Sequence, residues 1–291
     1  MSVVERRPAG VSSGGASGAV EPAGRRAAAV GTLLAIGSAA TFGLSGPTAK
    51  SLLEAGWSPL TVTLLRIGGG AVVLLVPTLV LLARSGGPRV AGWRTTVLYG
   101  VTSIAGVQLG FYNAVQTLTV GVAMLVEYLA PVLLLGWTWW RTGRRPGSTC
   151  LVGAGTALVG LVLVIDLTGG VAVDPVGLAW AFFAACCLAS YFALSAHAGD
   201  RVHPVVMAGA GSAVGAVTLA VVGALGVLPL HVGSQRVRFA GLETSWLVPA
   251  AVVVLVATVA AYLTGIAAVQ RLGSRVASFV GLTEALFAVV F

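Results

Sequence analysis

The segment AVQTLTVGVAMLVEYLAP, residues 114–131, recurs as AVQRLGSRVASFVGLTEA at residues 268–285, an offset of 154 positions. Seven of the 18 aligned residues are identical. Roughly two identities would be expected between segments so rich in Ala and Val. Two shorter correspondences support the duplication: Ser58-Pro59 with His203-Pro204, and Trp93 with Trp246. The chain is therefore predicted to contain two related halves.

The composition predicts that both halves lie in a lipid bilayer. Of the 291 residues, 57% are hydrophobic and only 9% are charged, whereas a soluble domain has about 25% charged residues. This composition excludes a soluble enzyme, a nucleic-acid-binding domain and a disordered protein. The net charge of +8 lies in short clusters between apolar stretches and forms no single basic face. Because the apolar stretches are long and continuous, they favour membrane-spanning helices over an outer-membrane barrel.

A transmembrane helix needs about 20 apolar residues. Charged residues, Gly/Pro clusters and Trp residues divide the chain into nine candidate spans: 28–53, 59–83, 93–115, 119–140, 147–166, 176–198, 203–227, 246–269 and 275–291. The polar residues Asn113, Gln116 and Thr117 mark the turn between the third and fourth spans. Residues 1–26 are rich in Gly, Ala and Ser and are predicted to form a disordered cytoplasmic tail.

The distribution of Lys and Arg predicts a cytoplasmic N-terminus in the cell membrane. With this orientation, 13 basic residues lie on the cytoplasmic side: Arg6, Arg7, Arg25, Arg26, Arg84, Arg89, Arg94, Arg141, Arg144, Arg145, Arg201, Arg271 and Arg275. The outer side holds only three, which are Lys50, Arg236 and Arg238. Such an excess of Lys and Arg is typical of cytoplasmic loops.

Five spans form the first predicted half, at residues 27–166, and four form the second, at residues 176–291. Because five is odd, the second half enters the membrane from the opposite side. Such an inverted repeat is typical of transporters, in which two mirrored halves expose one central site to either side in turn. The predicted fold class is an all-α integral membrane protein with an inverted repeat of five-helix units.

Together these features resemble the EamA-type members of the drug/metabolite transporter superfamily. The resemblance rests on Lys50, on Ser58-Pro59 with Arg66, and on the two duplicated runs. It implies a ten-helix fold with both termini in the cytoplasm and a substrate cavity between the halves near mid-membrane. The Glu-Tyr-x-x-Pro run from Glu127 to Pro131 is similar to that of threonine/homoserine-type exporters, which implies amino acids as substrates.

The sequence departs from this family in two places. It ends at Phe291, inside the ninth span, before a tenth helix. We expect either that the gene continues past this codon or that the chain is a truncated, non-transporting membrane subunit. The family often has an acidic residue just after the fourth helix, where this chain instead has Arg141, Gly143, Arg144 and Arg145.

Ionisable residues inside the predicted spans are the first candidates for a transport path, because each costs about 2.5–3.5 kcal/mol at mid-helix. Arg66 lies about 10 Å into the second span, and Glu127 lies about 12 Å into the fourth. Both spans begin on the outer side, so the two groups are expected to approach each other or to share one polar cavity. The alternative is a structural ion pair that only fixes helix packing.

A second acid, Glu284, lies nine residues into the ninth span, which begins on the inner side. The repeat aligns it with Ala130, one helical turn from the position of Glu127. The mirrored halves would therefore carry one acid each. A proton relay between these acids is one hypothesis, and two separate structural acids are the alternative.

Polar and aromatic residues within the spans complete the predicted transport path: Gln108, Tyr112, Asn113, Tyr191 and Tyr262. Tyrosines in membrane helices also serve as interfacial anchors or packing elements. Tyr128 follows Glu127 directly and is expected to face elsewhere on a regular helix.

The sequence predicts neither an enzyme nor a metal or cofactor site. It has no Ser/His/Asp arrangement, HExxH motif or CxxC motif, and its three Cys fit neither a disulfide framework nor a metal site. The predicted function is export of a small metabolite by alternating access. The alternatives are export of a drug or another metabolite, uptake, and a membrane enzyme that acts on lipid, for which no polar cluster has catalytic spacing.

Overall fold

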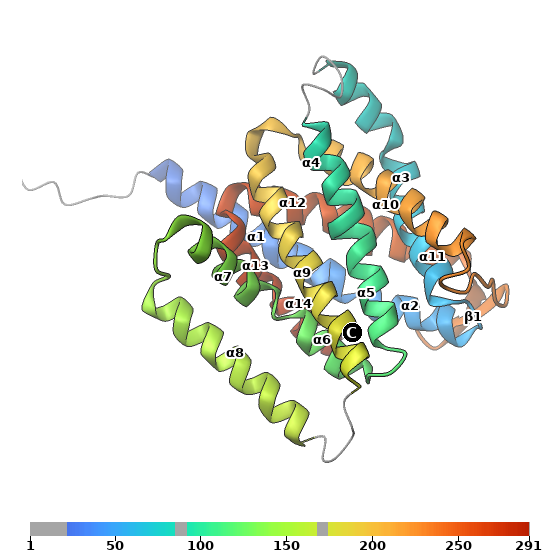
Figure 1. Ribbon diagram of the computed structural model, residues 1–291. Helices are drawn as coiled ribbons and strands as arrows, with labels where there is room; N and C mark the ends of the chain where they lie inside the picture. The colour runs from blue at the N-terminus through green and yellow to red at the C-terminus, as the bar shows by residue number, and fades with distance from the viewer. Residues whose placement is uncertain (1–21, 85–91, 168–173, 291) are drawn as a thin grey trace, which may run out of the picture.

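The computed structural model describes residues 22–84, 92–167 and 174–290, which are mostly helical (Figure 1). Nine helical segments in this part of the chain correspond to the nine predicted spans: α1 (Pro22–Gly43) with α2 (Ser45–Glu54); α3 (Pro59–Arg84); α4 (Trp93–Leu98) with η1 (Tyr99–Gly106) and α5 (Val107–Ala114); α6 (Val120–Glu127) with α7 (Ala130–Thr142); α8 (Ser148–Leu167); α9 (Pro175–Ala198); α10 (Pro204–Ala224); α11 (Leu247–Ala251) with η3 (Val252–Ala260) and α12 (Ala261–Leu272); and α13 (Ser274–Gly281) with α14 (Thr283–Val290). Six of these segments are long and apolar enough to cross a membrane. The predicted all-α membrane fold is confirmed.

The boundary of the predicted N-terminal tail is corrected by the structure. Helix α1 begins at Pro22, so residues 22–26 are helical, whereas the sequence predicted disorder up to residue 26. Proline is well suited to a first helical position, and the Arg and Ala residues that follow favour helix. The rest of the predicted tail, residues 1–21, lies outside the described residues.

The connection from α10 to α11 contains a hairpin that the sequence analysis did not predict. Strands β1 (Arg236–Phe239) and β2 (Leu242–Ser245) pair antiparallel. Ala240 and Gly241 both have positive φ, as the tight turns of two-residue hairpins require. The same connection is tied to the start of α3, because the Trp57 indole N–H donates to the Ser234 carbonyl at 3.1 Å. We call this end of the bundle the hairpin end, and the opposite end the α9–α10 end.

The two duplicated runs fold into two helices that are broken at matching positions. An offset of 154 residues maps α6 onto α13, and the breaks that follow lie at Tyr128–Leu129 and at Leu282. In the first half the cause is Pro131, whose ring excludes a regular helical bond to the carbonyl of Glu127. In the second half, which has no proline at this place, the Thr283 hydroxyl donates to the Val280 carbonyl at 2.7 Å, and a backbone N–H at the end of α13 donates to the same carbonyl.

A second irregularity is repeated in the same way. The described residues include two π-helical stretches, η1 and η3, and the same offset of 154 places Tyr99–Gly106 on residues 253–260, within η3. π-Helices are rare and often lie at functional sites. Their matching positions in both halves support the predicted repeat.

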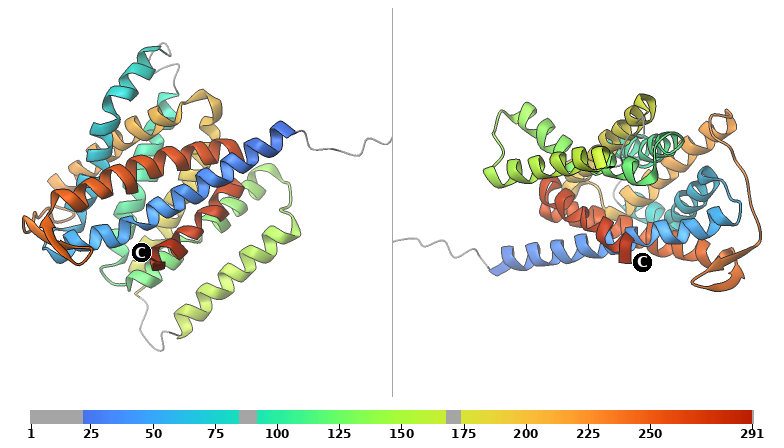
Figure 2. Two further views of the ribbon diagram at one scale, coloured as in Figure 1. Left: turned by 180° about the vertical axis from the view of Figure 1, so that it is seen from behind. Right: turned by 90° about the horizontal axis from the view of Figure 1, so that it is seen from below.

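Equivalent helices of the two halves pack against equivalent neighbours in the opposite half. Helix α1 packs against α12, α13 and α14, and α9 packs correspondingly against η1, α5, α6 and α7. The pair α3 and α10 lies between the halves. The view from behind in Figure 2 (left) shows α1 and α12 side by side. Helix α8 contacts the bundle mainly through α6 and stands apart from the other segments (Figure 1).

The close approach of η1 and α10 depends on a glycine. A Cβ at Gly100 would lie 2.6 Å from the Gly211 carbonyl oxygen and 2.6 Å from Val214 Cβ, closer than real Cβ atoms approach other atoms. By contrast, a Cβ at Gly136 of α7 would meet nothing within 4 Å.

We expect Gly100→Ala to destabilise the protein by about 1–3 kcal/mol, because the methyl group forces η1 and α10 apart. Gly136→Ala, the matched control, should be neutral or stabilising by up to about 1 kcal/mol. Thermal unfolding in detergent, followed by tryptophan fluorescence, measures both. Equal unfolding temperatures for the two variants would show that η1 and α10 do not pack this closely.

Candidate functional site

Arg66 lies on α3, in the part of that helix nearer the hairpin end. Its side chain is half-buried, and its guanidinium carbon lies 5.9 Å from the centroid of the Phe42 ring. It also hydrogen-bonds to the hydroxyl of Tyr262 on α12. The Nε atom of Arg66 is buried and has no hydrogen-bond partner among the described residues. The guanidinium therefore keeps one donor unused in an interior where donors are normally satisfied.

The two acids predicted from the sequence both lie within electrostatic range of Arg66, although no ion pair of 4.0 Å or less joins them to it among the described residues. Glu127 is the last residue of α6, and Glu284 lies in the first turn of α14, so each acid lies at one of the two helix breaks. Arg66 interacts electrostatically with each of them, and they also interact with each other. Both carboxylates are half-buried. The repeat thus supplies two acids to one cation.

Three of the predicted tyrosines surround these charges. Tyr112 of α5 is hydrogen-bonded to Thr63 of α3 and interacts electrostatically with Arg66. Tyr191 of α9 interacts with Glu284, and its ring centroid lies 6.4 Å from that of Tyr262. We call Arg66, Glu127, Glu284, Tyr112, Tyr191 and Tyr262 the central cluster.

Two other predicted residues lie apart from the central cluster. Asn113 donates its side-chain amide to the Leu109 carbonyl at 2.8 Å, within its own helix. Gln108 is half-buried on the same helix, and no described contact joins it to the central cluster. Both therefore stay weaker candidates for the transport path than the six residues that converge.

The structure adds two residues that the sequence analysis did not select for the path. Phe42 stacks against Arg66 and meets the Tyr262 ring edge-on, with centroids 5.1 Å apart. Tyr128 interacts electrostatically with both acids, although a regular helix would turn it away from Glu127. The sequence contained a signal for this direction of Tyr128. Pro131 interrupts the regular helix at Tyr128, so the side chain need not follow regular helical geometry.

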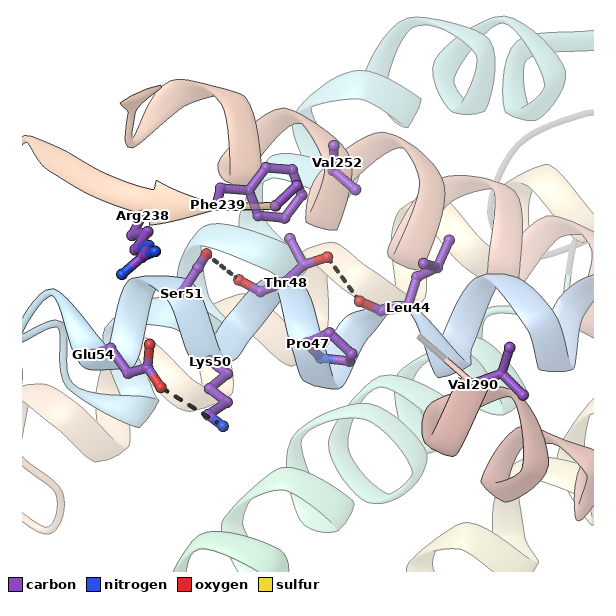
Figure 3. Close-up of a pocket in the computed structure, with 11 residues that line it drawn as sticks. Leu44, Pro47, Thr48, Lys50, Ser51, Glu54, Arg238, Phe239, Val252 and Val290 are labelled. Carbon is purple, nitrogen blue, oxygen red and sulfur yellow. Dashed lines mark hydrogen bonds and ion pairs between the residues drawn. The ribbon is translucent and has the colours of Figure 1, made fainter. Parts of the chain in front are cut away.

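A cavity of about 520 Å³ opens at the hairpin end of the bundle. It is lined by α2, the hairpin, η3 and Val290, as Figure 3 shows. Lys50 and Glu54 form an exposed ion pair of 3.7 Å at its edge. Thr48, Ser51 and Arg238 add polar groups to a lining that is otherwise largely apolar.

Chemically, the central cluster offers one guanidinium, two carboxylates and several phenol hydroxyls in a largely apolar bundle. A guanidinium binds a carboxylate through two parallel hydrogen bonds, and a carboxylate accepts hydrogen bonds from an ammonium group. Among the described residues, no group of His, Cys, Asp and Glu could hold a metal ion. The arrangement is therefore suited to binding a small polar molecule that carries charge.

Comparison with known proteins finds a family match in the first half of the chain. Residues 29–166 match the model of the EamA-like transporter family. No curated protein matches the chain. A solved structure titled only "Crystal structure of protein" has 21% sequence identity and a TM-score of 0.63, and covers 91% of this chain and 88% of its own. At this identity the likeness shows a shared fold alone. The resemblance to EamA-type transporters is confirmed, whereas similarity to threonine exporters is not shown.

The charge balance around Arg66 can be tested by stability. We expect Arg66→Gln to destabilise the protein by about 2–5 kcal/mol, because it leaves two carboxylates without a counter-charge. Adding Glu284→Gln should recover more than half of that loss. The measurement is the shift of the thermal unfolding midpoint in detergent for each variant.

The exposed pair provides the control for this experiment. Lys50→Gln should change stability by no more than about 0.5 kcal/mol, because water screens the charges of Lys50 and Glu54. If the losses of stability from Arg66→Gln and Glu284→Gln simply add in the double variant, the two side chains do not interact. The central cluster would then not exist as described.

Proposed function

We propose that this chain, a multi-pass membrane protein of the EamA type, exports small metabolites across the cell membrane by alternating access through the central cluster. One observation carries the proposal: Arg66 interacts with an acid from each half, and each acid lies at a helix break. Charged groups in a membrane interior generally mark the path of a substrate or ion. Broken helices next to such groups are typical of transporter binding sites.

The helix breaks support the proposal through their free backbone groups. A carbonyl without its helical donor is costly in lipid, but it is tolerated where it faces a cavity or protein groups. The break after Glu127 leaves such a carbonyl beside the acid itself. A substrate in the central cluster would therefore meet backbone acceptors as well as side chains.

The charges in the central cluster favour a zwitterionic substrate, and we propose an amino acid. Arg66 would bind its carboxylate, and Glu127 or Glu284 would accept hydrogen bonds from its ammonium group. The rings of Phe42, Tyr191 and Tyr262 would enclose the rest of the molecule. Export of a drug or another metabolite, and uptake, are the alternatives within the same class.

Proton coupling is a further part of the proposal. Two carboxylates share one guanidinium, so one acid is without a full counter-charge when the substrate's ammonium is absent. A proton on that acid would balance the charge, and substrate binding would displace it.

The proposed orientation has the N-terminus in the cytoplasm. It is supported by the 13 basic residues on the predicted cytoplasmic side, against three on the predicted outer side.

We expect Glu127→Gln and Glu284→Gln each to reduce efflux of the transported amino acid at least about tenfold, because each removes an acceptor for the ammonium group and a site for the proton. Exporter-deficient cells loaded with a panel of labelled amino acids, with or without the gene, give the rates. Immunoblots of the membrane fraction confirm equal expression.

Glu243→Gln is the matched control, because Glu243 is an exposed acid on β2, outside the bundle. Its efflux should equal that of the unchanged chain. Full efflux by both central variants would refute the role of the acids. No release of any amino acid would remove the amino-acid substrate and would favour the drug exporter or the non-transporting subunit.

Proton coupling has its own expected result. In proteoliposomes that enclose a pH-sensitive dye, addition of the substrate should change the internal pH, and Glu127→Gln should abolish this change. Substrate flux without any change in pH would show that the acids bind substrate but do not carry protons.

A further inference from the structure

Three buried hydroxyl groups lie between the central cluster and the α9–α10 end. Tyr99, Ser195 and Ser212 have side-chain oxygens without a hydrogen-bond partner among the described residues. Tyr99 and Ser195 are 0% exposed and Ser212 is 1% exposed. They come from η1, α9 and α10, so both halves contribute. We call these three residues the inner hydroxyls.

Their state is unusual in a folded protein. Most buried polar groups are paired, because an unpaired group loses its hydrogen bonds to water and gains none in return. Phe or Ala in place of these residues would avoid that loss. The packing seen in the structure therefore does not explain why residues with hydroxyl groups occur at these three positions.

All three inner hydroxyls lie in the same part of the bundle. Ser195 is three residues from the end of α9, which is about 5 Å at 1.5 Å per residue. Ser212 is about 12 Å into α10, and Tyr99 is about 9 Å from the start of α4, and both of these helices begin at the α9–α10 end. The inner hydroxyls thus occupy the half of the bundle opposite the hairpin.

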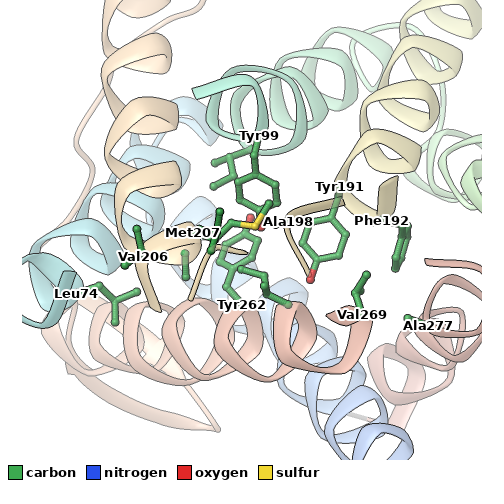
Figure 4. Close-up of a cluster of buried hydrophobic side chains, with 14 of the residues drawn as sticks. Leu74, Tyr99, Tyr191, Phe192, Ala198, Val206, Met207, Tyr262, Val269 and Ala277 are labelled. Carbon is green, nitrogen blue, oxygen red and sulfur yellow. The ribbon is translucent and has the colours of Figure 1, made fainter. Parts of the chain in front are cut away.

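Aromatic contacts connect the inner hydroxyls to the central cluster. The Tyr99 and Tyr191 ring centroids are 5.7 Å apart, and those of Tyr191 and Tyr262 are 6.4 Å apart. Tyr262 in turn bonds Arg66. Figure 4 shows the three tyrosines entering one region from three different elements, with Met207 beside them. A continuous row of phenol groups therefore runs from Arg66 toward the α9–α10 end.

This half of the bundle is closed in the structure. The cluster of buried side chains around Tyr99, Tyr191 and Met207 also includes Val202 from the α9–α10 connection and Val206 from the first turn of α10. The Tyr99 ring lies against Gly211, where an added Cβ would be 2.7 Å from its Cδ1 atom. The 520 Å³ cavity, in contrast, lies at the hairpin end.

We propose that the inner hydroxyls line the second half of the transport path, which opens at the α9–α10 end when the hairpin end closes. The inference rests on the proposed function and assigns the wall of its second half. In the open state water would bond all three hydroxyls. Hydration would thereby favour opening, which offsets the apolar contacts that opening breaks.

Cysteine accessibility tests this proposal without any transport measurement. Cys150, Cys186 and Cys187 are first replaced by Ala, and then Ser195→Cys or Ser212→Cys is introduced. A charged, membrane-impermeant methanethiosulfonate reagent is applied to right-side-out and inverted membrane vesicles. Both new cysteines should react at least about tenfold faster from the side of the α9–α10 end than from the other side.

Ala184→Cys is the control for burial alone. Ala184 is also 0% exposed on α9, but it packs against α5, where a Cβ on Gly110 would lie 3.0 Å from its own Cβ. It should react at least about tenfold more slowly than Cys at 195 or 212. Equal rates at all three positions, or faster reaction from the hairpin side, would overturn the proposal.

Removal of single hydroxyls gives a second, independent result. Tyr99→Phe and Ser212→Ala remove an unpaired group from the closed state, so the unfolding temperature should rise while efflux slows at least about threefold. A purely structural role would raise the unfolding temperature and leave efflux unchanged, which would refute the proposal. If labelling is side-specific but no efflux is found, the path stands and the proposed substrate fails. If efflux is found without labelling, only the present inference fails.

Discussion

A guanidinium in the membrane interior must be balanced by nearby charge, and the interior of this protein is arranged around that requirement. Arg66 interacts electrostatically with an acid from each half, is hydrogen-bonded to a phenol of α12 and lies over the ring of Phe42. Each of these partners comes from a different segment. The positions of α1, α3, α6, α12 and α14 relative to one another are therefore linked through a single side chain.

Each acid near Arg66 lies at a break in its helix. In the repeat Glu284 aligns with Ala130, one helical turn from the position of Glu127, so the two acids lie on opposite sides of equivalent breaks. The two breaks have different local sequences, with Pro131 after the break in one half and Thr283 after the break in the other. The same backbone shape is thus kept by unrelated residues, which indicates that the shape is needed more than either residue.

Much of this arrangement could be predicted from the sequence. The nine segments could be located from the apolar stretches, because a membrane-spanning helix is recognised mainly by its length and its hydrophobicity. Equal depth suggested that Arg66 and Glu127 lie close together. However, the meeting with Glu284, the stacking of Phe42 and the direction of Tyr128 all depend on how helices lie side by side. Periodicity within one helix does not contain that information, and the hairpin at residues 236–245 lacked a recognisable turn pair, since Ala240 adopts the left-handed conformation.

The two π-helical stretches also bear on the history of the chain. A π-helical turn accommodates an additional residue and changes the register of everything that follows it. η1 and η3 lie at equivalent positions in halves that share few identical residues. One ancestral unit that already had this irregularity, and that was later joined to an inverted copy of itself, accounts for both with a single event. On this account, the present protein descends from a shorter gene whose product inserted in both orientations and assembled as a pair.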